Sequence, residues 1–433
     1  MRIVMIGTGY VGLVSGACFS DFGHRVTCVD KDPAKVEALL DGRIPIFEPG
    51  LEILVNRNVE AGRLDFTLDL AEVVPEADAV FIAVGTPSRH GDGHADLKYV
   101  HAAAREVAPY LKPGAVVVNK STVPVGTGDA VQRMIREQCP DAEFYVASNP
   151  EFLREGSAID DFKRPDRVVV GVNEREAETV MREVYRPLTH NESQLVLMSR
   201  PAAELTKYAA NAFLATKISF INEIADLCER VGADVHDVAH GIGLDARIGS
   251  RFLQPGPGYG GSCFPKDTLA LLKTGEDHEA PQRIVEAVVK SNDWRKRSMG
   301  RKVLQSLDGD PHGKTVALLG LTFKANTDDM RDSPAIAIVQ TLQDAGVSIR
   351  AYDPEGMEQA SKVIDNITYC EDVYETMDGA DAAVITTEWD AFRALDFARV
   401  EKLLNAKVLV DLRNLYEREP MERLGFRYHA IGR

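Results

Sequence analysis

The segment GPGYGGSCFPKD at residues 256–267 places one cysteine, Cys263, between a run of glycines and the expected start of a helix. A thiol at a helix N-terminus lies at the positive end of the helix dipole, and the nearby Lys266 adds a positive charge. Both effects favour the thiolate, which is the nucleophilic form. Asp267 follows four residues after the cysteine and would share its helix face, where a carboxylate can act as a base or orient a water molecule. A tight turn with a buried cysteine is the alternative interpretation.

A short helix is predicted to hold this cysteine in place. Pro265 suits a first helical turn, and the apolar run at residues 269–272 continues the pattern until Gly275.

A much longer helix is predicted over residues 201–231, which contain no internal proline or glycine and repeat apolar residues at helical spacing. Its length exceeds that of most globular helices, so we expect it to join domains and to pair with a second subunit. Lys207 and Asn211 lie one turn apart on it, where an ammonium and an amide can stabilise a developing oxyanion. A merely polar helix face is the alternative.

The N-terminus has the order strand, glycine turn, helix, strand and acid. An apolar run at residues 2–6 leads into GTGYVG at residues 7–12, and a second run at residues 26–29 ends in Asp30. Such glycines let a pyrophosphate approach the helix N-terminus, and the acid suits a ribose 2′-hydroxyl. Asp30 favours NAD over NADP, although the adjacent Lys31 weakens that preference.

Further predicted strands end in small polar residues. The run at residues 79–84 is followed by Thr86, and the run at residues 115–119 is followed by Ser121 and Thr122. Parallel strands deliver such residues to a cofactor at the carboxyl edge of the sheet, although turn formation alone explains them equally well.

The strand predicted at residues 144–147 precedes the segment NPEFLREG. Its carboxylates, Glu151 and Glu155, are four residues apart and would share a face if the segment were helical. Acid–base chemistry and a solvated helix start are both compatible with this spacing.

A second α/β pattern follows a linker at residues 308–313. Its strands are predicted at residues 316–319, 347–352, 382–385 and 408–410. Lys324, Arg331 and Arg413 fall near the ends of these strands, where three cations suit an anionic ligand such as a nucleotide diphosphate. Solvated surface cations are the alternative.

These patterns predict an α/β fold with two Rossmann-like doubly wound domains joined by a long central helix and a helical middle domain. The expected boundaries are residues 1–198 for an NAD-binding domain, 199–300 for a central helical domain with the cysteine loop, and 301–433 for a second Rossmann-like domain.

Composition limits the function classes. A net charge of −16 over 433 residues argues against nucleic acid and anionic membranes as partners. The six cysteines are scattered without metal-ligand spacing, so we expect reduced thiols and no metal. No signal peptide or membrane-spanning run is recognisable, and we expect a cytoplasmic protein.

Eight motifs together resemble the nucleotide-sugar 6-dehydrogenases and span almost the whole chain. They are GTGYVG, FEPGL (47–51), STVPVGT (121–127), NPEFLREG (149–156), KYAANAFLA (207–215), GPGYGGSCFPKD, LTFKANTDDMRDSP (321–334) and DLRNLYE (411–417). Phe47 stands where many relatives carry a tyrosine before EPGL, which removes a hydroxyl but affects no residue with an expected catalytic role. GPGYGG and DLRNLY favour the branch that acts on UDP-glucose, and Ser262 stands where the UDP-N-acetylmannosamine branch carries histidine.

The resemblance implies that UDP-glucose, two NAD and water give UDP-glucuronate and two NADH. Cys263 would carry a thiohemiacetal and then a thioester, which explains how one site performs two oxidations. Asp267 and Thr122 would handle protons and water, Glu151 would assist hydrolysis, and Lys207 with Asn211 would stabilise oxyanions.

The resemblance also assigns binding residues. NAD would contact Gly7, Gly9, Tyr10, Val11, Gly12, Asp30, Lys35, Thr86, Ser121, Thr122, Glu155, Lys266 and Arg331. The UDP-sugar would contact Glu151, Phe152, Leu153, Lys207, Asn211, Arg247, Phe252, Gly256, Tyr259, Gly260, Phe323, Lys324 and Arg413. Arg247 would reach into the site of a neighbouring subunit, so the resemblance implies a homodimer.

Three other classes of protein share part of this sequence pattern. A GDP-mannose 6-dehydrogenase would share the chemistry and differ in the base. A hydroxyacid dehydrogenase of the 6-phosphogluconate type would share the first domain and the long helix, but it needs no nucleophilic cysteine. A non-catalytic NAD sensor would need neither Cys263 nor the oxyanion donors.

Overall fold

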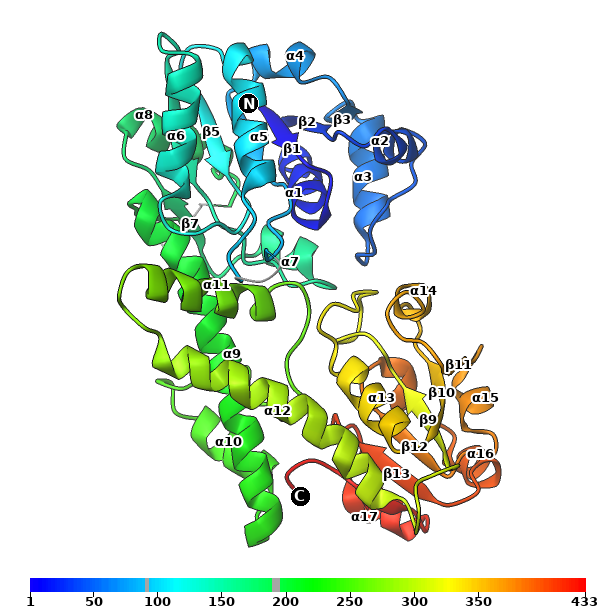
Figure 1. Cartoon of the computed structure of the whole chain (residues 1–433). Coiled ribbons are helices and arrows are strands. Elements are labelled where there is room, and N and C mark those ends of the chain that lie inside the picture. The colour runs from blue at the N-terminus through cyan, green and yellow to red at the C-terminus, as the bar shows by residue number, and fades with distance from the viewer. Residues whose placement is uncertain (90–92, 189–194) are drawn as a thin grey trace. The chain divides into compact units, whose positions relative to one another are not determined.

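The computed structural model describes residues 1–89, 93–188 and 195–433, and the chain divides into two compact units (Figure 1). Unit 1 comprises Met1–Ala210 and Lys273–Glu279, and unit 2 comprises Asn211–Leu272 and Ala280–Arg433. Each unit contains a largely parallel sheet covered by helices on both faces, which confirms the predicted α/β fold with two Rossmann-like domains. The finer division into three domains stays a prediction.

Unit 1 is built on a sheet with the strand order β3-β2-β1-β4-β5-β6-β7-β8. The strands are β1 (Arg2–Ile6), β2 (Arg25–Val29), β3 (Leu64–Thr67), β4 (Ala79–Ile82), β5 (Ala115–Asn119), β6 (Phe144–Ser148), β7 (Val168–Gly171) and β8 (Leu195–Met198). All neighbouring strands are parallel except β6 and β7. The order reverses between β1 and β4, and ligands of such sheets bind at the carboxyl ends of the strands at this reversal.

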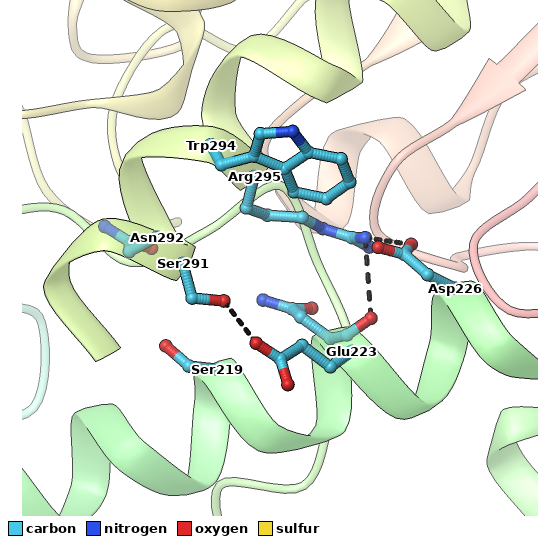
Figure 2. Close-up of a pocket in the computed structure, with 8 residues that line it drawn as sticks. Ser219, Glu223, Asp226, Ser291, Asn292, Trp294 and Arg295 are labelled. Carbon is cyan, nitrogen blue, oxygen red and sulfur yellow. Dashed lines mark hydrogen bonds and ion pairs between the residues drawn. The ribbon is translucent and has the colours of Figure 1, made fainter. Parts of the chain in front are cut away.

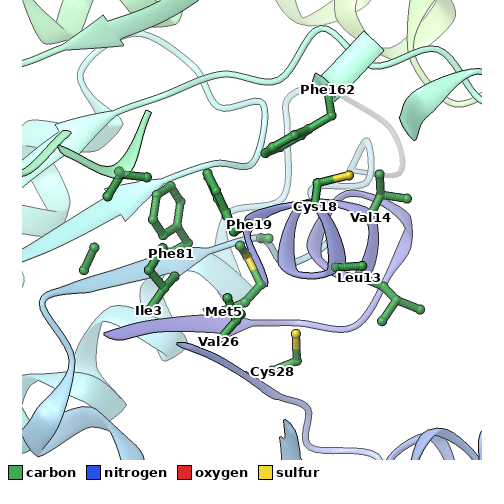
Figure 3. Packing of buried hydrophobic residues seen from close by; sticks show 14 of the residues in the cluster. Ile3, Met5, Leu13, Val14, Cys18, Phe19, Val26, Cys28, Phe81 and Phe162 are labelled. Carbon is green, nitrogen blue, oxygen red and sulfur yellow. The ribbon is translucent and has the colours of Figure 1, made fainter. Parts of the chain in front are cut away.

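Two apolar cores lie on opposite faces of this sheet. One face packs against α1 (Tyr10–Asp21), α2 (Pro33–Leu40), α3 (Leu51–Glu60), α7 (Ala158–Lys163) and α8 (Arg175–Val184). The other face packs against α5 (Lys98–Val107) and α6 (Thr127–Gln138), with the short α4 (Leu70–Val73) beside them. In the first core, Phe19 of α1 meets Phe162 of α7 edge-on with ring centroids 5.0 Å apart, and Phe81 of β4 lies 5.2 Å away (Figure 3). This aromatic packing fixes the helix that begins at the glycine turn.

Unit 2 repeats the same strand order in an entirely parallel sheet, β11-β10-β9-β12-β13-β14. The strands are β9 (Thr315–Leu319), β10 (Ser348–Tyr352), β11 (Thr368–Tyr369), β12 (Ala382–Ile385), β13 (Val408–Asp411) and β14 (Arg427–His429). Its helices are α10 (Val235–Gly243), α13 (Pro334–Asp344), α14 (Met357–Ala360), α15 (Val373–Met377), α16 (Phe397–Leu403) and α17 (Arg418–Arg423).

Three longer helices complete the chain: α9 (Arg200–Val231), α11 (Phe264–Asp277) and α12 (Arg283–Ser306). The 32-residue α9 confirms the predicted long helix, and its first residues belong to unit 1 and the rest to unit 2. Helix α11 begins as expected with Pro265 in its first turn, but it continues through Gly275 to Asp277. A glycine inside a helix costs only about 1 kcal/mol, which is too little to end it. Within the described ranges, no helix is both long and apolar enough to cross a membrane.

Candidate active site

The three glycines of the N-terminal turn have three different surroundings. Gly7 has a φ of +99°, and a Cβ there would lie 2.7 Å from the carbonyl oxygen of Ala83. A Cβ on Gly12 would lie 1.9 Å from the carbonyl oxygen of Gly7. Gly9 has an ordinary φ of −72°, and a Cβ there would meet nothing within 4 Å. Gly7 and Gly12 are therefore required by the fold, whereas Gly9 leaves open space at the start of α1.

That open space lies where a helix offers unpaired donors. No side chain caps the N-terminus of α1, and its first turn carries no acidic residue. Unpaired N–H groups and the helix dipole make such an end a binding site for a phosphate group. The residues at this turn therefore fit the pyrophosphate of NAD.

Asp30 stands at the end of β2 beside this turn. Its Oδ2 accepts hydrogen bonds from the Thr8 backbone N–H at 2.8 Å and the Thr8 hydroxyl at 2.7 Å, and its Oδ1 accepts one from Asp32 N–H at 3.1 Å. Burial raises the pKa of Asp30, but these hydrogen bonds and the charge of Lys35 on α2 outweigh it and lower the pKa overall. The carboxylate stays ionised, and Oδ1 retains acceptor capacity for a ribose hydroxyl.

The ends of β4 and β5 meet at the carboxyl edge of the sheet, as predicted. The Thr86 hydroxyl donates to the Thr122 carbonyl oxygen at 2.9 Å, and the Ser121 hydroxyl donates to the Val84 carbonyl oxygen at 2.7 Å. All three polar residues are buried. They lie at the ends of β4 and β5, and β4 neighbours β1, the strand that leads into the glycine turn.

The segment after β6 holds Glu151, and it is not helical. The Glu151 carboxylate accepts a hydrogen bond from the Leu153 N–H at 2.6 Å, a local turn that competes with helix formation after Pro150. The i, i+4 helical relation of Glu151 with Glu155 therefore does not arise. Instead, Glu151 is buried against the ammonium of Lys207 on α9, with Oε1 and Nζ 3.1 Å apart.

Lys120, at the end of β5, is a buried cation beside this pair to which sequence reasoning gave no role. Its Nζ donates to the Asn149 side-chain oxygen and to the Tyr185 hydroxyl, both at 3.2 Å. Burial lowers the pKa of Lys120 to about 8, while the charge of Glu151 raises it and that of Lys207 lowers it further. Its position directly before Ser121 in the STVPVGT motif was the available signal.

Glu48 of the FEPGL motif is a second residue that the sequence did not assign. Its buried carboxylate accepts hydrogen bonds from the Gly156 and Ala158 N–H groups, each at 2.7 Å, and from the Tyr10 hydroxyl. Burial and this carboxylate raise the pKa of Tyr10, so its hydroxyl remains a donor. Glu48 thereby ties the first residue of α1 to the segment that carries Glu155.

In unit 2, Cys263 directly precedes α11, and its carbonyl oxygen accepts the Asp267 N–H at 2.8 Å, which makes it the first residue of the helix's hydrogen-bond ladder. The Asp267 side chain is buried, with 1% of it exposed. Its Oδ1 accepts from Lys266 Nζ and its Oδ2 from Asn211 Nδ2 of α9, each at 2.7 Å. The structure thus unites Asp267 with Lys266 and Asn211 at the predicted helix start.

The glycines before Cys263 permit a close approach of the loop after β9. A Cβ on Gly260 would lie 2.4 Å from the Asp332 carbonyl oxygen, and one on Gly261 would lie 2.7 Å from the Phe323 ring. Gly261 also has a φ of +82°, and its N–H donates to the Arg331 carbonyl oxygen at 2.8 Å. Phe252, Gly256 and Tyr259 precede these glycines in the same loop, and Gly260 and Gly261 bring its end against Phe323.

The predicted cations of unit 2 have different surroundings. Lys324 Nζ lies 5.4 Å from the Phe323 ring centroid, and Arg413 Nη2 donates to the Phe323 carbonyl oxygen at 2.8 Å, so these two cations both lie beside Phe323. Arg413 Nε also pairs with Glu388 at 3.0 Å. The Arg331 guanidinium pairs with Asp329 and is mostly exposed. Arg247 is 88% exposed and pairs with Asp245.

The second sheet has a counterpart of Asp30 that is closed to a ribose. Asp353 follows β10 as Asp30 follows β2, but it is completely buried. Six hydrogen bonds reach its two oxygens, from Leu321 N–H, Thr322 N–H and hydroxyl, Trp389 Nε1, Glu355 N–H and Gly356 N–H. Helix α13 is also capped by its own Ser333, unlike α1. Of the two sheets, the first therefore fits NAD.

Three regions of the chain match models of the UDP-glucose/GDP-mannose dehydrogenase family: the NAD binding domain at residues 1–189, the central domain at residues 201–294 and the UDP binding domain at residues 317–418. The chain is 64% identical to the UDP-glucose 6-dehydrogenase of Rhizobium meliloti, with 100% of both chains covered.

Solved structures are similar as well. The UDP-glucose dehydrogenase of Pyrobaculum islandicum superposes with a TM-score of 0.89 at 41% identity, covering 99% of this chain and 96% of that one. The GDP-mannose dehydrogenase of Pseudomonas aeruginosa gives a TM-score of 0.55 at 32% identity, covering 96% of this chain and 98% of that one.

The glycine geometry predicts the effect of adding a side chain at the turn. Gly9→Val should fold normally, because its side chain enters open space, but it should weaken NAD binding by at least about tenfold by occupying the approach of the pyrophosphate. Isothermal titration with NAD measures this, with the thermal midpoint as a fold control. Gly12→Ala should instead lower the thermal midpoint. Unchanged NAD affinity in a folded Gly9→Val variant would contradict the site.

Proposed function

This chain belongs to the UDP-glucose/GDP-mannose dehydrogenase family, and from that membership we propose that it oxidises UDP-glucose twice, with two NAD and water, to UDP-glucuronate. The observation that carries the proposal is Cys263 at the start of α11, followed by a buried carboxylate held by Lys266 and Asn211. Neither a single-step dehydrogenase nor an NAD sensor has a use for a nucleophile in this setting.

UDP-glucose is preferred over GDP-mannose as the substrate. The relative that acts on UDP-glucose is 64% identical over the whole chain, whereas the relative that acts on GDP-mannose is 32% identical. Lys324 and Arg413, which gather around Phe323, supply the cations for the diphosphate.

The reaction divides into two oxidations separated by a covalent bond. NAD, when bound at the glycine turn, accepts the hydride in each oxidation. The Cys263 sulfur adds to the aldehyde carbon produced by the first oxidation, and the thiohemiacetal oxygen takes up a proton. The second oxidation removes the remaining hydride and leaves a thioester, and water then cleaves the carbon–sulfur bond and returns the thiol. The covalent bond prevents the aldehyde from leaving between the two steps.

We assign roles to the remaining polar residues from the family resemblance, and the contacts that they make support these roles. Glu151, ion-paired with Lys207, is the base for the hydrolytic water, and Thr122 orients that water. Lys207 and Asn211 donate to the oxyanions, because an ammonium and an amide one turn apart on α9 are both buried donors. Asp267 takes the proton of the alcohol or the thiol.

The proposal is tested by measuring NADH formation with NAD and UDP-glucose, UDP-galactose, GDP-mannose or UDP-N-acetylmannosamine, counting NADH per sugar consumed. Two NADH per UDP-glucose is the expected result. A response to GDP-mannose alone would move the chain to the other substrate of its family, and one NADH per sugar would refute the double oxidation.

The covalent role of the thiol predicts a specific loss. Cys263→Ala should abolish UDP-glucuronate formation, because no thioester can form, while NAD affinity stays unchanged, because the thiol is not among the residues assigned to NAD. Chromatographic assay of the acid and titration with NAD measure both. Cys139→Ala, at a partly buried cysteine of unit 1, is the matched control. Normal turnover by Cys263→Ala would exclude the covalent mechanism.

We also propose a homodimer formed through α9. Phe213, Phe220 and Leu227 recur at seven-residue intervals on this helix and are between 51% and 65% exposed, which makes one apolar stripe along it. A stripe of this kind suits pairing with the same helix of a second copy. The exposed Arg247 is then available to the partner's site, as the family resemblance implies. None of the six cysteines forms a disulfide, which supports a reducing, cytoplasmic location.

The dimer predicts linked changes in assembly and substrate binding. Phe220→Asp should yield a monomer in sedimentation velocity, because two carboxylates would oppose each other across the helix pair. It should also raise the KM for UDP-glucose, as should Arg247→Ala, which leaves the dimer intact. Ile53→Asp, at an exposed apolar residue of unit 1, is the control.

Two results would count against this arrangement. A dimeric Phe220→Asp variant would exclude the α9 stripe as the interface. An unchanged KM in Arg247→Ala would remove this arginine from the shared site.

A further inference from the structure

The loop that precedes Cys263 has its backbone held by side chains from two helices. Asn222 Oδ1 of α9 accepts the Gly256 N–H at 2.8 Å, and Arg295 Nε of α12 donates to the Gly256 carbonyl oxygen at 3.0 Å. Asn292, also on α12, accepts the Tyr259 N–H at 2.8 Å and donates to the Tyr259 carbonyl oxygen at 3.0 Å. These three side chains satisfy buried backbone groups that belong to no strand or helix, and we term them the loop clamp.

The loop clamp is itself buried and held by ion pairing. Arg295 is 2% exposed, and its Nη1 pairs with Asp226 of α9. Figure 2 shows Arg295 reaching from α12 to Asp226, with Ser291 of α12 turned to Glu223 of α9, to which its hydroxyl donates at 2.7 Å. A guanidinium can serve Gly256 and Asp226 at once because its donors form a rigid fork, which an ammonium lacks.

The clamp also dictates residue size in the loop. Gly258 has a φ of +117°, and a Cβ there would lie 2.9 Å from Asn292 Oδ1 and 3.2 Å from Lys296 Cγ of α12. The loop therefore lies directly against α12, and no larger residue fits between them. This contact with α12 explains why residue 258, the second glycine of the GPGYGG motif, is a glycine.

The clamped residues lead to the thiol through aromatic contacts. The Tyr259 ring, 5% exposed, meets the Phe264 ring edge-on with centroids 6.0 Å apart, and Phe264 lies 6.2 Å from the Phe252 ring. Phe264 is the first residue of α11 and directly follows Cys263. A shift of Tyr259 would therefore move the start of α11 and the sulfur with it.

We propose that Asn292 and Arg295 are positioning residues that set the place of Cys263 through the Gly256–Tyr259 backbone. The proposal rests on the proposed function for its catalytic consequence, since it names residues that serve the nucleophile of that reaction. Both residues contact the loop backbone and are not among the residues assigned to the substrate or to NAD.

The test measures the reactivity of Cys263 in two ways, by turnover of UDP-glucose and by chemical alkylation in the absence of turnover. In Asn292→Ala, kcat with UDP-glucose should fall by at least about tenfold, because small misplacements of a reacting group have large effects on rate. The rate of Cys263 alkylation by iodoacetamide, followed by peptide mass spectrometry across pH 6–10, should change by a similar factor. Alkylation of Cys139 in unit 1 and the NAD affinity should stay unchanged.

A graded series separates positioning from mere stability. Asn292→Asp keeps the acceptor for Tyr259 N–H and should show a smaller loss, and it serves if Asn292→Ala does not fold. Arg295→Lys keeps a positive charge beside Asp226, but an ammonium cannot also donate to the Gly256 carbonyl oxygen in the geometry of the guanidinium. We therefore expect its kcat to be lower than that of the wild-type protein. Arg297→Met, on the exposed side of α12, is the matched control.

The outcomes are distinguishable. Folded Asn292 and Arg295 variants with wild-type kcat and wild-type Cys263 alkylation, whatever their thermal midpoints, would overturn the proposal and leave these residues a purely structural role. A wild-type protein that makes no NADH from UDP-glucose, but whose Cys263 alkylation responds to Asn292→Ala, would refute the proposed function and support the positioning role.

Discussion

A completely buried carboxylate needs partners that satisfy its oxygens, and in Asp267 one of these partners is a cation. Its two oxygens accept from Lys266 and Asn211. Loss of the Lys266 ammonium would leave an uncompensated buried charge at a cost of about 3–5 kcal/mol, and loss of Asn211 would remove a hydrogen bond from the carboxylate. This requirement fixes the first turn of α11, and hence Cys263, to helix α9. One turn earlier on α9, Lys207 satisfies a second buried carboxylate, Glu151, in the same way. Two buried acids, Asp267 and Glu151, thus each contact a polar side chain of α9.

The two sheets share one topology and differ in what their carboxyl edges leave open. In both, a glycine with positive φ ends the first strand, Gly7 at +99° and Gly320 at +97°. In both, a threonine after it donates to an acid after the second strand. Asp30 can still accept a hydrogen bond, and no side chain caps α1 beside it. The oxygens of Asp353 already accept six hydrogen bonds, and Ser333 caps α13. Local hydrogen bonding, and not the fold, decides which copy suits a dinucleotide.

Much of the fold followed from the sequence, because strands and helices here have strong periodic patterns. The glycine turn, the strand ends at Thr86 and Thr122, and α9 all lie where those patterns indicated. Local details differed: α11 runs through Gly275, because one glycine costs too little to end a helix, and the segment at Glu151 forms a turn, so the shared helix face considered for Glu151 and Glu155 does not arise. Two buried polar residues, Glu48 and Lys120, were missed for a related reason. Their partners are distant in sequence, and composition carries no signal of such pairing.

The central claim is that one thiol carries the sugar between its two oxidations, and trapping that adduct tests it most directly. A variant with impaired hydrolysis, Glu151→Gln, is mixed with UDP-glucose and NAD, quenched in acid and examined by peptide mass spectrometry. We expect a glucuronyl-UDP group on the Cys263 peptide, formed as two NADH appear per active site. Two NADH and free UDP-glucuronate, with an unmodified Cys263 throughout, would contradict the covalent mechanism.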